Sequence, residues 1–274
     1  MQCLTDCNMK KSDFLLTTFN LGVCMKYILT IFISILPIVV SAENITIRDS
    51  VRDRSIPIEI NFPIEYENCT HQKRCQVAFV SAGNRVPFTK YKFITKSLNE
   101  HGYMTVSIDH ELPNDPPLSK TGDLYQTRIE NWKRGAKTIK YLKGKLESRF
   151  PTYDFNKLTL VGHSNGGDIS AWFSNDNNDY IHQLITLDSK RVSLPKNNNI
   201  RVLSIRSPEY PTALGVLPTI EDQKLYGICI VDMSASKHMD FTDFGVDRVQ
   251  KKTIKTMLGF LKNKTCTTLR SEIE

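Results

Sequence analysis

Two kinds of hydrophobic pattern alternate along the chain from about residue 55 onward. Residues 55–62 (SIPIEINF) alternate between apolar and polar positions, which is typical of a β-strand with one buried face. Short apolar runs indicate further buried strands at residues 75–80, 104–108, 158–161, 183–187, 202–205 and 227–233. Helical spacing separates several of these runs, over residues 90–101, 122–150 and 246–261, and another helix is expected to begin near Asn165.

Strands that alternate with helices of this length predict an α/β fold, a mostly parallel central sheet with helices on both faces. No internal repeat, low-complexity tract or linker interrupts residues 43–274, so we expect them to form one domain. A composition of 40% hydrophobic and 24% charged residues provides for one large core and excludes a disordered, collagenous or coiled-coil protein. The net charge of +7 is not gathered in a block, so no nucleic-acid partner is expected.

Residues 1–42 have the layout of a secretory signal peptide. Met25 and Lys26 precede an uncharged, mostly apolar run at residues 27–40, and small residues follow it as far as Ala42. The run is shorter than the roughly 20 residues that a membrane-spanning helix needs. We therefore predict cleavage after Ala42 and export to the periplasm or the medium. An uncleaved N-terminal membrane anchor is the alternative, and Met25 could be the true start of the protein.

Four of the seven cysteines lie beyond this predicted signal peptide. Cys69 and Cys75 enclose a short polar loop, and export would expose them to an oxidising compartment, so we predict that they form a disulfide. Cys229 lies in an apolar run and is expected to be a buried free thiol. The sequence has no CxxC pair and no cluster of His and Cys at zinc spacing, so neither a metal nor a cofactor is expected.

Residues 158–168 (LTLVGHSNGGD) carry the strongest chemical signal. They contain the G-x-S-x-G motif, in which a serine stands on a sharp turn between a strand and a helix. The turn lifts the Ser164 hydroxyl above the sheet, and Gly162 and Gly166 allow the strand and the helix to cross closely. The first N–H groups of the helix then face a developing oxyanion. Ser164 is the predicted nucleophile, and the backbone N–H of Asn165 is one predicted oxyanion donor.

A serine hydroxyl needs a general base to act as a nucleophile near neutral pH. In chains built on this motif the order is Ser, acid, His, which leaves His182 and His238 among the six histidines. His182 begins the strand-like run 183–187 and is expected at the opposite end of the sheet from Ser164. His238 is therefore the predicted base.

Two carboxylates compete for the role of the acid. Glu209 follows the run 202–205, and Asp188 ends the preceding run, so both are expected at the carboxyl end of the sheet. Glu209 is the preferred acid, and Asp188 is the alternative. Asp168, one helical turn beyond Ser164, is expected to brace the sharp turn at Ser164 (the elbow) instead.

The second oxyanion donor is expected in the loop at residues 81–84 (SAGN), which follows a predicted strand. The N–H of Asn84 is the candidate, because Gly83 lets the backbone approach the substrate. A further polar cluster, residues 109–111 (DHE), ends another strand at the same end of the sheet. We expect this cluster to brace loops, with contact to the substrate as the alternative.

These features resemble the α/β-hydrolase fold over nearly all of residues 45–261. Residues 48–63 (RDSVRDRSIPIEINFP) and the GHSNGG turn are similar to bacterial enzymes related to dienelactone hydrolase and platelet-activating-factor acetylhydrolase. The resemblance implies ester hydrolysis through an acyl-enzyme, with Ser164 and His238 in the matching positions and no metal or cofactor. A small-molecule or lipid-like ester is the implied substrate.

The chain departs from that family pattern in three places. Ala82-Gly83 stands where His-Gly is usual, and the preferred acid, Glu209, is a glutamate where aspartate is common. Residues 188–201 leave room only for a short loop where many relatives insert a helical lid, so a reduced or absent lid and an open site are expected.

The predicted function is therefore that of an exported serine hydrolase acting on a carboxylic ester. An acyltransferase, or a catalytically silent binding module on the same fold, is the alternative. Nine Lys and Arg residues between positions 120 and 149 predict a solvated basic helix face, and weak association with an anionic membrane surface is the alternative interpretation.

Overall fold

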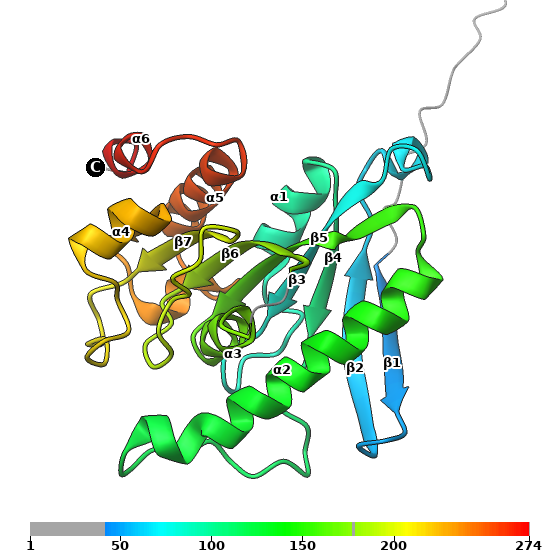
Figure 1. The fold of residues 1–274 in the computed structure, drawn as a ribbon, viewed down its shortest axis with the longest axis horizontal. Coiled ribbons are helices and arrows are strands. Elements are labelled where there is room, and N and C mark those ends of the chain that lie inside the picture. The colour runs from blue at the N-terminus through cyan, green and yellow to red at the C-terminus, as the bar shows by residue number, and fades with distance from the viewer. Residues whose placement is uncertain (1–41, 177–178, 274) are drawn as a thin grey trace, which may run out of the picture. The chain divides into compact units, whose positions relative to one another are not determined.

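The structure is a computed structural model that describes residues 42–176 and 179–273, so residues 1–41 of the predicted signal peptide lie outside the described residues. Eight strands form one sheet in the order β1-β2-β4-β3-β5-β6-β7-β8 (Figure 1). The strands are β1 (Glu43–Asp49), β2 (Arg54–Asn61), β3 (Cys75–Ser81), β4 (Tyr103–Ile108), β5 (Tyr153–His163), β6 (Ile181–Leu187), β7 (Arg201–Arg206) and β8 (Ile228–Asp232). β2 runs antiparallel to β1 and β4, and all other neighbouring strands are parallel. The predicted mostly parallel sheet is confirmed.

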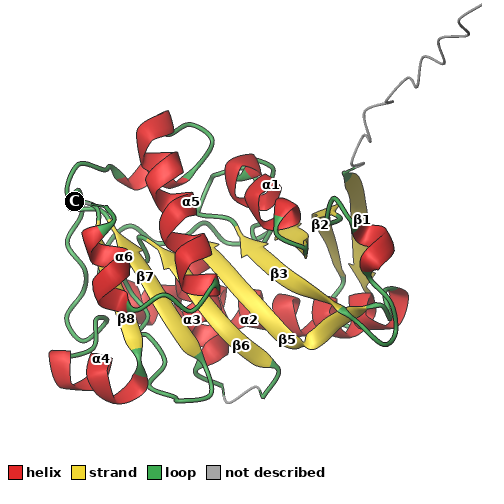
Figure 2. Cartoon of the chain, turned by 90° about the horizontal axis from the view of Figure 1, so that it is seen from above, coloured by secondary structure: helices red, strands yellow, loops and turns green. Residues whose placement is uncertain are grey.

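Helices cover both faces of this sheet (Figure 2). They are α1 (Lys92–Glu100), α2 (Leu124–Arg149), α3 (Asn165–Ser174), α4 (Ile220–Tyr226), α5 (Asp247–Leu261) and α6 (Cys266–Ser271), with short 3-10 turns η1 (Tyr66–Asn68) and η2 (His238–Phe241). Apolar side chains of α2 and α3 join one core cluster, and those of α1, α5 and α6 join the other. The central strands supply both clusters in alternation: Val77 and Phe79 of β3 face one, and Ala78 and Val80 face the other.

The elements that the sequence predicted appear within a few residues of their expected bounds, and three further elements do not follow from it. β1 is a strand at the edge of the sheet whose alternating pattern contains only two apolar residues, Ile45 and Ile47, which is a weaker signal than the four in residues 55–62. α4 and α6 are a seven-residue and a six-residue helix. Residues 188–200, between β6 and β7, contain no helix, so the expected absence of a helical lid at that point agrees with the structure.

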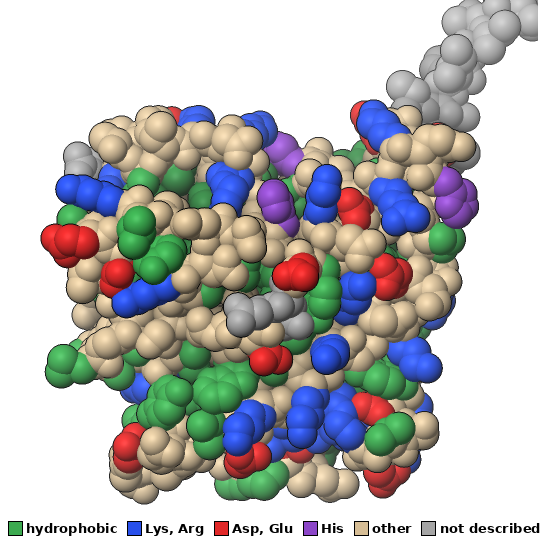
Figure 3. Space-filling view, in the orientation of Figure 1, with side chains coloured by type: hydrophobic (Ala, Val, Ile, Leu, Met, Phe, Trp, Pro, Cys, Tyr) green, Lys and Arg blue, Asp and Glu red, His purple; other side chains and the backbone are tan. Residues whose placement is uncertain are grey.

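α2 lies across one face of the sheet with a buried stripe and a solvated basic side. Its N-terminus is capped by the Asp123 carboxylate, which accepts the N–H groups of Tyr125 and Gln126. Several of its cations pair with carboxylates, including Lys133 with Glu130. Figure 3 shows Lys and Arg side chains interspersed with Asp and Glu on this face. None of the helices within the described ranges combines the length and the apolar character that crossing a bilayer requires.

Two disulfides join the four cysteines that follow the predicted signal peptide. The Cys69–Cys75 bond confirms the prediction from the sequence, with Cα atoms 5.1 Å apart. The expectation that Cys229 is a free thiol is wrong, because α5 and α6 bring Cys266 back to β8, where it bonds to Cys229. The link spans 37 residues, and in the chain-entropy model a loop of that length contributes about 4 kcal/mol to stability, against about 2 kcal/mol for the six-residue Cys69–Cys75 loop.

Candidate active site

Ser164 occupies a strained turn between β5 and α3. Its backbone has φ 53° and ψ −122°, and residues other than glycine rarely adopt such a positive φ. The turn is held by hydrogen bonds on both sides: Ser164 N–H donates to the carbonyl of Leu187 at 2.9 Å, and Asp168 N–H donates to the carbonyl of Ser164 at 3.0 Å. A conformation of this kind costs on the order of 1–3 kcal/mol, so its presence at a chemically reactive side chain indicates a functional constraint.

The glycines around Ser164 are required by close backbone contacts. A Cβ atom at Gly162 would overlap the backbone of Gly166, and one at Gly166 would overlap the carbonyl of Ser81 at the end of β3. The close crossing of strand and helix that the sequence predicted is therefore confirmed. It also places the loop that follows β3 directly beside Ser164.

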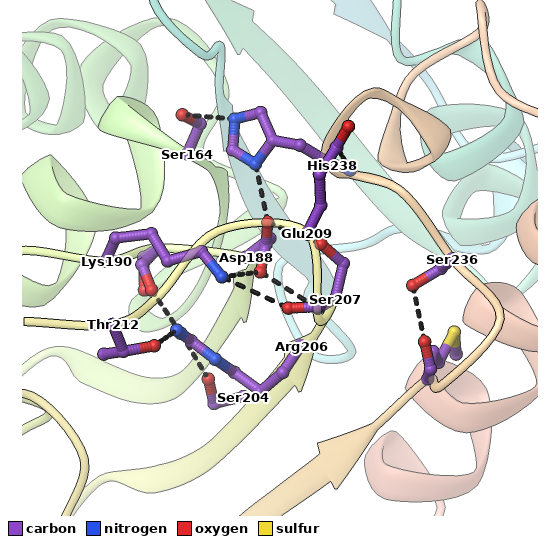
Figure 4. A network of polar contacts seen from close by, with 12 residues as sticks. Ser164, Asp188, Lys190, Ser204, Arg206, Ser207, Glu209, Thr212, Ser236 and His238 are labelled. Atoms are coloured by element: carbon purple, nitrogen blue, oxygen red, sulfur yellow. Dashed lines mark hydrogen bonds and ion pairs between the residues drawn. The ribbon is translucent and has the colours of Figure 1, made fainter.

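Three side chains from separate loops form one hydrogen-bonded chain at the carboxyl end of the sheet (Figure 4). His238, at the start of η2, lies between the other two: its Nε2 is 2.9 Å from Ser164 Oγ, and its Nδ1 is 2.6 Å from Asp188 Oδ2. A carboxylate can only accept, so Nδ1 carries the proton and Nε2 is free to accept the serine hydroxyl. This geometry allows His238 to take a proton from Ser164.

The structure places Asp188, and not the preferred Glu209, against the imidazole ring. Glu209 Oε2 accepts the backbone N–H of His238 at 2.6 Å instead. Asp188 immediately follows β6, which pairs directly with β5, so its side chain reaches the ring beside Ser164. Glu209 lies three residues beyond the end of β7 and reaches only the backbone of the histidine loop. Of the two candidates for the acid, the alternative, Asp188, therefore contacts the imidazole ring, and the preferred Glu209 does not.

The Asp188 carboxylate is fully buried and receives hydrogen bonds from four donors. Besides His238, it accepts the N–H and the hydroxyl of Ser207 at 2.9 and 3.0 Å, and its Oδ1 lies 2.6 Å from the ammonium nitrogen of Lys190. Burial alone would raise the pKa of the Asp188 carboxyl, but the bonds from His238, Lys190 and Ser207 outweigh it and hold that pKa well below its usual value. Asp188 is therefore ionised at neutral pH.

A second buried chain of hydrogen bonds links the loop after β3 to the histidine loop. His163 Nε2 lies 3.0 Å from the carbonyl of His238 and must donate to it. Its Nδ1 then accepts the Tyr91 hydroxyl at 3.0 Å, and the oxygen of Tyr91 accepts the N–H of Gly83 at 2.8 Å. Burial lowers the pKa of His163 to about 3, so this ring stays neutral.

Of the two predicted oxyanion donors, Asn165 directly follows Ser164, and Asn84 follows Gly83 in the loop after β3. A Cβ atom on Gly83 would lie 3.2 Å from Ser164 Cβ, which shows how closely the loop after β3 approaches the serine. The N–H of Gly83 is used by Tyr91, whereas the N–H of Asn84 has no hydrogen-bond partner among the residues that the structure describes. Asn165 is the first residue of α3, so its N–H has no partner within the helix.

The structure also shows the positions of Asp168 and His182, two further residues considered in the sequence analysis. Asp168 Oδ1 accepts the N–H groups of three consecutive residues beyond Asp188, at 2.9 to 3.2 Å, so it braces the elbow as expected. Burial raises the pKa of Asp168 to about 6 although these bonds lower it. His182 lies near the start of β6, at the end of the sheet opposite to Ser164. Within residues 42–176 and 179–273, no three His, Cys, Asp or Glu side chains converge in a way that could hold a metal ion.

The cluster at residues 109–111 also braces loops. His110 Nε2 lies 3.0 Å from the hydroxyl of Ser81, and Asp109 Oδ1 accepts the N–H of Glu111 at 3.2 Å. The same cluster and the loop that contains Gly83 line a pocket of about 330 Å³, together with Val86 and Phe88. Ser164 does not line this pocket, but Gly83 both lines it and lies close to Ser164.

Comparisons with known proteins identify the fold. Scans against protein-family models and curated protein sequences find no match to the chain. Among solved structures, Est1E from Butyrivibrio proteoclasticus has 13% sequence identity and a TM-score of 0.54, over 81% of this chain and 100% of that chain. Thermogutta terrifontis esterase 2 phosphoramylated by tabun has 13% identity and a TM-score of 0.58, over 81% and 94%.

A peptidase matches as well: Porphyromonas gingivalis dipeptidyl peptidase 4 has 12% identity and a TM-score of 0.55, over 79% of this chain and 35% of that chain. Esterases and a peptidase thus share the architecture. Together with the mostly parallel eight-stranded sheet, these matches show that the chain has the α/β-hydrolase fold that the sequence predicted. At this level of identity, the likeness is one of fold alone.

Proposed function

We propose that the protein is a serine hydrolase that cleaves a carboxylic ester through an acyl-enzyme on Ser164. The observation that carries the proposal is the chain of hydrogen bonds from Ser164 through His238 to Asp188, on a strained elbow beside two candidate oxyanion donors. This is the arrangement of a nucleophile, its base and the group that orients the base.

Each group has a defined step in the proposed reaction. His238 Nε2 takes the proton of Ser164 as the serine oxygen attacks the carbonyl carbon, and ionised Asp188 stabilises the resulting imidazolium. The carbonyl oxygen becomes an oxyanion between the N–H groups of Asn165 and Asn84. The intermediate then expels the alcohol, which receives the proton from His238. Water attacks the acyl-serine by the same route and releases the acid.

An ester is proposed over an amide because of the form of the site. The neighbouring pocket is small, at about 330 Å³, and residues 188–200 add no helical lid. A small-molecule or lipid-like ester with one compact group fits this space better than a peptide. Acyl transfer to an alcohol uses the same acyl-enzyme and is the second candidate; the ratio of transfer product to free acid in the presence of an added alcohol distinguishes the two.

A fluorophosphonate probe tests the serine hydrolase proposal. The probe should label the wild-type protein covalently at Ser164, because an activated serine attacks its phosphorus atom, and Ser164→Ala should remove all labelling. Ser148→Ala is the matched control, at an exposed serine on α2, and should label like the wild type. Mass spectrometry of the labelled peptide identifies the site. Folded wild-type protein that remains unlabelled would rule the proposal out.

Export is proposed as part of the same function. Both disulfides are typical of a protein that folds in an oxidising compartment, which supports the predicted signal peptide. N-terminal sequencing of the protein recovered outside the cytoplasm is expected to begin at Glu43. Recovery of the full-length chain with reduced cysteines from the cytoplasm would contradict export.

A further inference from the structure

We propose that Glu111 is a positioning residue that fixes the two oxyanion donors relative to each other. The proposal rests on the proposed function, since it concerns the residues that would stabilise the oxyanion. Glu111 follows β4 and contacts neither the ring of His238 nor the hydroxyl of Ser164 through any hydrogen bond of the described residues. Its influence on the reaction would therefore pass through other residues.

One carboxylate holds the side chains of both candidate donor residues. Asn84 Nδ2 donates to the two oxygens of Glu111 at 2.9 and 2.7 Å, and Asn165 Nδ2 donates to Glu111 Oε1 at 3.1 Å. The backbone N–H groups of the same two asparagines are the predicted oxyanion donors. Glu111 thus connects the loop after β3 to the start of α3 at the two positions where the distance between donors matters.

The Asn165 end of this connection is rigid. Its side chain is buried, its Oδ1 accepts the indole N–H of Trp132 at 3.0 Å, and its Nδ2 also donates to Asn131 Oδ1 at 2.9 Å. Rotation of the amide would break both of these bonds to α2. Asn165 therefore provides a fixed point to which Glu111 can attach another loop.

The Asn84 end is less constrained without Glu111. Asn84 is half-buried, and the next residue, Arg85, is exposed and has φ 59°, a conformation that costs energy outside glycine. Arg85 N–H donates to Glu111 Oε2 at 3.3 Å, and the turn has one further backbone bond, from Val86 N–H to the carbonyl of Gly83. The Glu111 carboxylate thus stabilises a turn that the sequence does not favour by itself.

The negative charge of Glu111 and its proposed positioning role predict opposite changes in the reaction rate when the charge is removed. A negative charge close to a developing oxyanion repels it, so on electrostatic grounds alone a neutral residue at this position would accelerate the reaction. A carboxylate here benefits the reaction only if the positioning of the donors outweighs that repulsion. Replacement by glutamine therefore separates the two effects by the sign of the change in rate.

Glu111→Gln is expected to lower kcat for a p-nitrophenyl ester by about 10- to 100-fold with KM changed less than about threefold, because small displacements of oxyanion donors act on the transition state. Glutamine offers one oxygen where three donors converge, and the fixed amide of Asn165 cannot turn to accept its NH₂ group. The affinity for a trifluoromethyl ketone, which forms a tetrahedral oxyanion on the serine, should fall by the same factor. Glu130→Gln removes an exposed carboxylate on α2 and should leave all three quantities unchanged.

A double-mutant cycle distinguishes positioning from a general loss of structure. Asn84→Ala keeps the backbone donor but removes its bond to Glu111, so it should lower kcat by a factor similar to that of Glu111→Gln. The double variant should lose no more than either single variant, because both remove the same connection. Additive losses, or an unchanged or raised kcat in Glu111→Gln, would overturn this proposal. The proposed function would still stand if the wild type hydrolysed the ester. A wild type that neither hydrolyses the ester nor reacts with the fluorophosphonate would overturn both.

Discussion

Asp188→Asn is expected to lower kcat/KM by about 10³- to 10⁴-fold, whereas Glu209→Gln should lower it by less than about tenfold. The asparagine removes the charge that stabilises protonated His238, and its NH₂ group, if turned to the ring, would hold the imidazole with Nε2 protonated toward Ser164. Glutamine at position 209 keeps an oxygen that can accept the backbone N–H of His238. Steady-state kinetics on one ester measures both variants, and equal losses would return Glu209 to the role of acid.

A loss of folding must be separated from a loss of chemistry in this experiment. Asp188→Asn leaves the ammonium group of Lys190 buried without its counter-ion, and a broken buried pair of this kind costs about 3–5 kcal/mol. The double variant Asp188→Asn/Lys190→Met removes that unpaired charge. It should regain much of the free energy of unfolding and none of the activity. Recovery of activity in the double variant would contradict the assignment of Asp188.

The stability of the protein is expected to fall as the pH drops from 6.5 toward 3. Burial lowers the pKa of both His110 and His163 from 6.5 to about 3, and the charges of Arg54 and Arg134 add to the effect at His110. Below pH 6.5 the unfolded chain binds protons at these two positions and the folded chain does not. Each histidine then removes about 1.4 kcal/mol from the free energy of unfolding for every pH unit.

A comparison with His110→Asn isolates one of these contributions. Asp168 raises the free energy of unfolding as the pH falls from about 6 to 3.8, because burial raises its pKa to about 6. Both proteins contain Asp168, so the difference between the wild type and the variant cancels this effect. The stability of the wild type relative to His110→Asn should fall by about 2.3 kcal/mol between pH 6.5 and pH 4.5, as measured by urea unfolding. A difference that does not change with pH would show that His110 titrates alike in the folded and unfolded chains.

The fold and two members of the candidate triad were predictable because their signals lie in short motifs or in the order of residues along the chain. Ser164 stands in a five-residue motif between a strand and a helix, and the order of residues along the chain leaves His238 as its partner. Both predictions depend on patterns within a few residues, or on the sequence of elements. The close approach of the backbone at Gly166 follows from the same motif, since only glycine fits there.

The acid and the second disulfide depend on distances that no local pattern contains. Asp188 and Glu209 both follow parallel strands, and the choice between them depends on which loop reaches the His238 ring. Cys229 and Cys266 are 37 residues apart, and their bond depends on how α5 and α6 return to β8. Glu111 is similar: from the sequence it was expected at the correct end of the sheet as a bracing residue, but its simultaneous contact with two asparagines requires two loops to meet at the start of α3.

The Cys229–Cys266 bond also affects how readily the edge of the sheet can pair with another molecule. β8 forms an edge of the sheet, and an uncovered edge strand is a template on which another chain can add a strand. The disulfide ties α6 beside β8, and Arg270 of α6 donates from Nε to the carbonyl of Ile230 at 2.8 Å, which occupies part of that edge. We therefore expect oxidation to protect the chain from self-association at β8, and we expect protein that folds before this bond has formed to aggregate more readily.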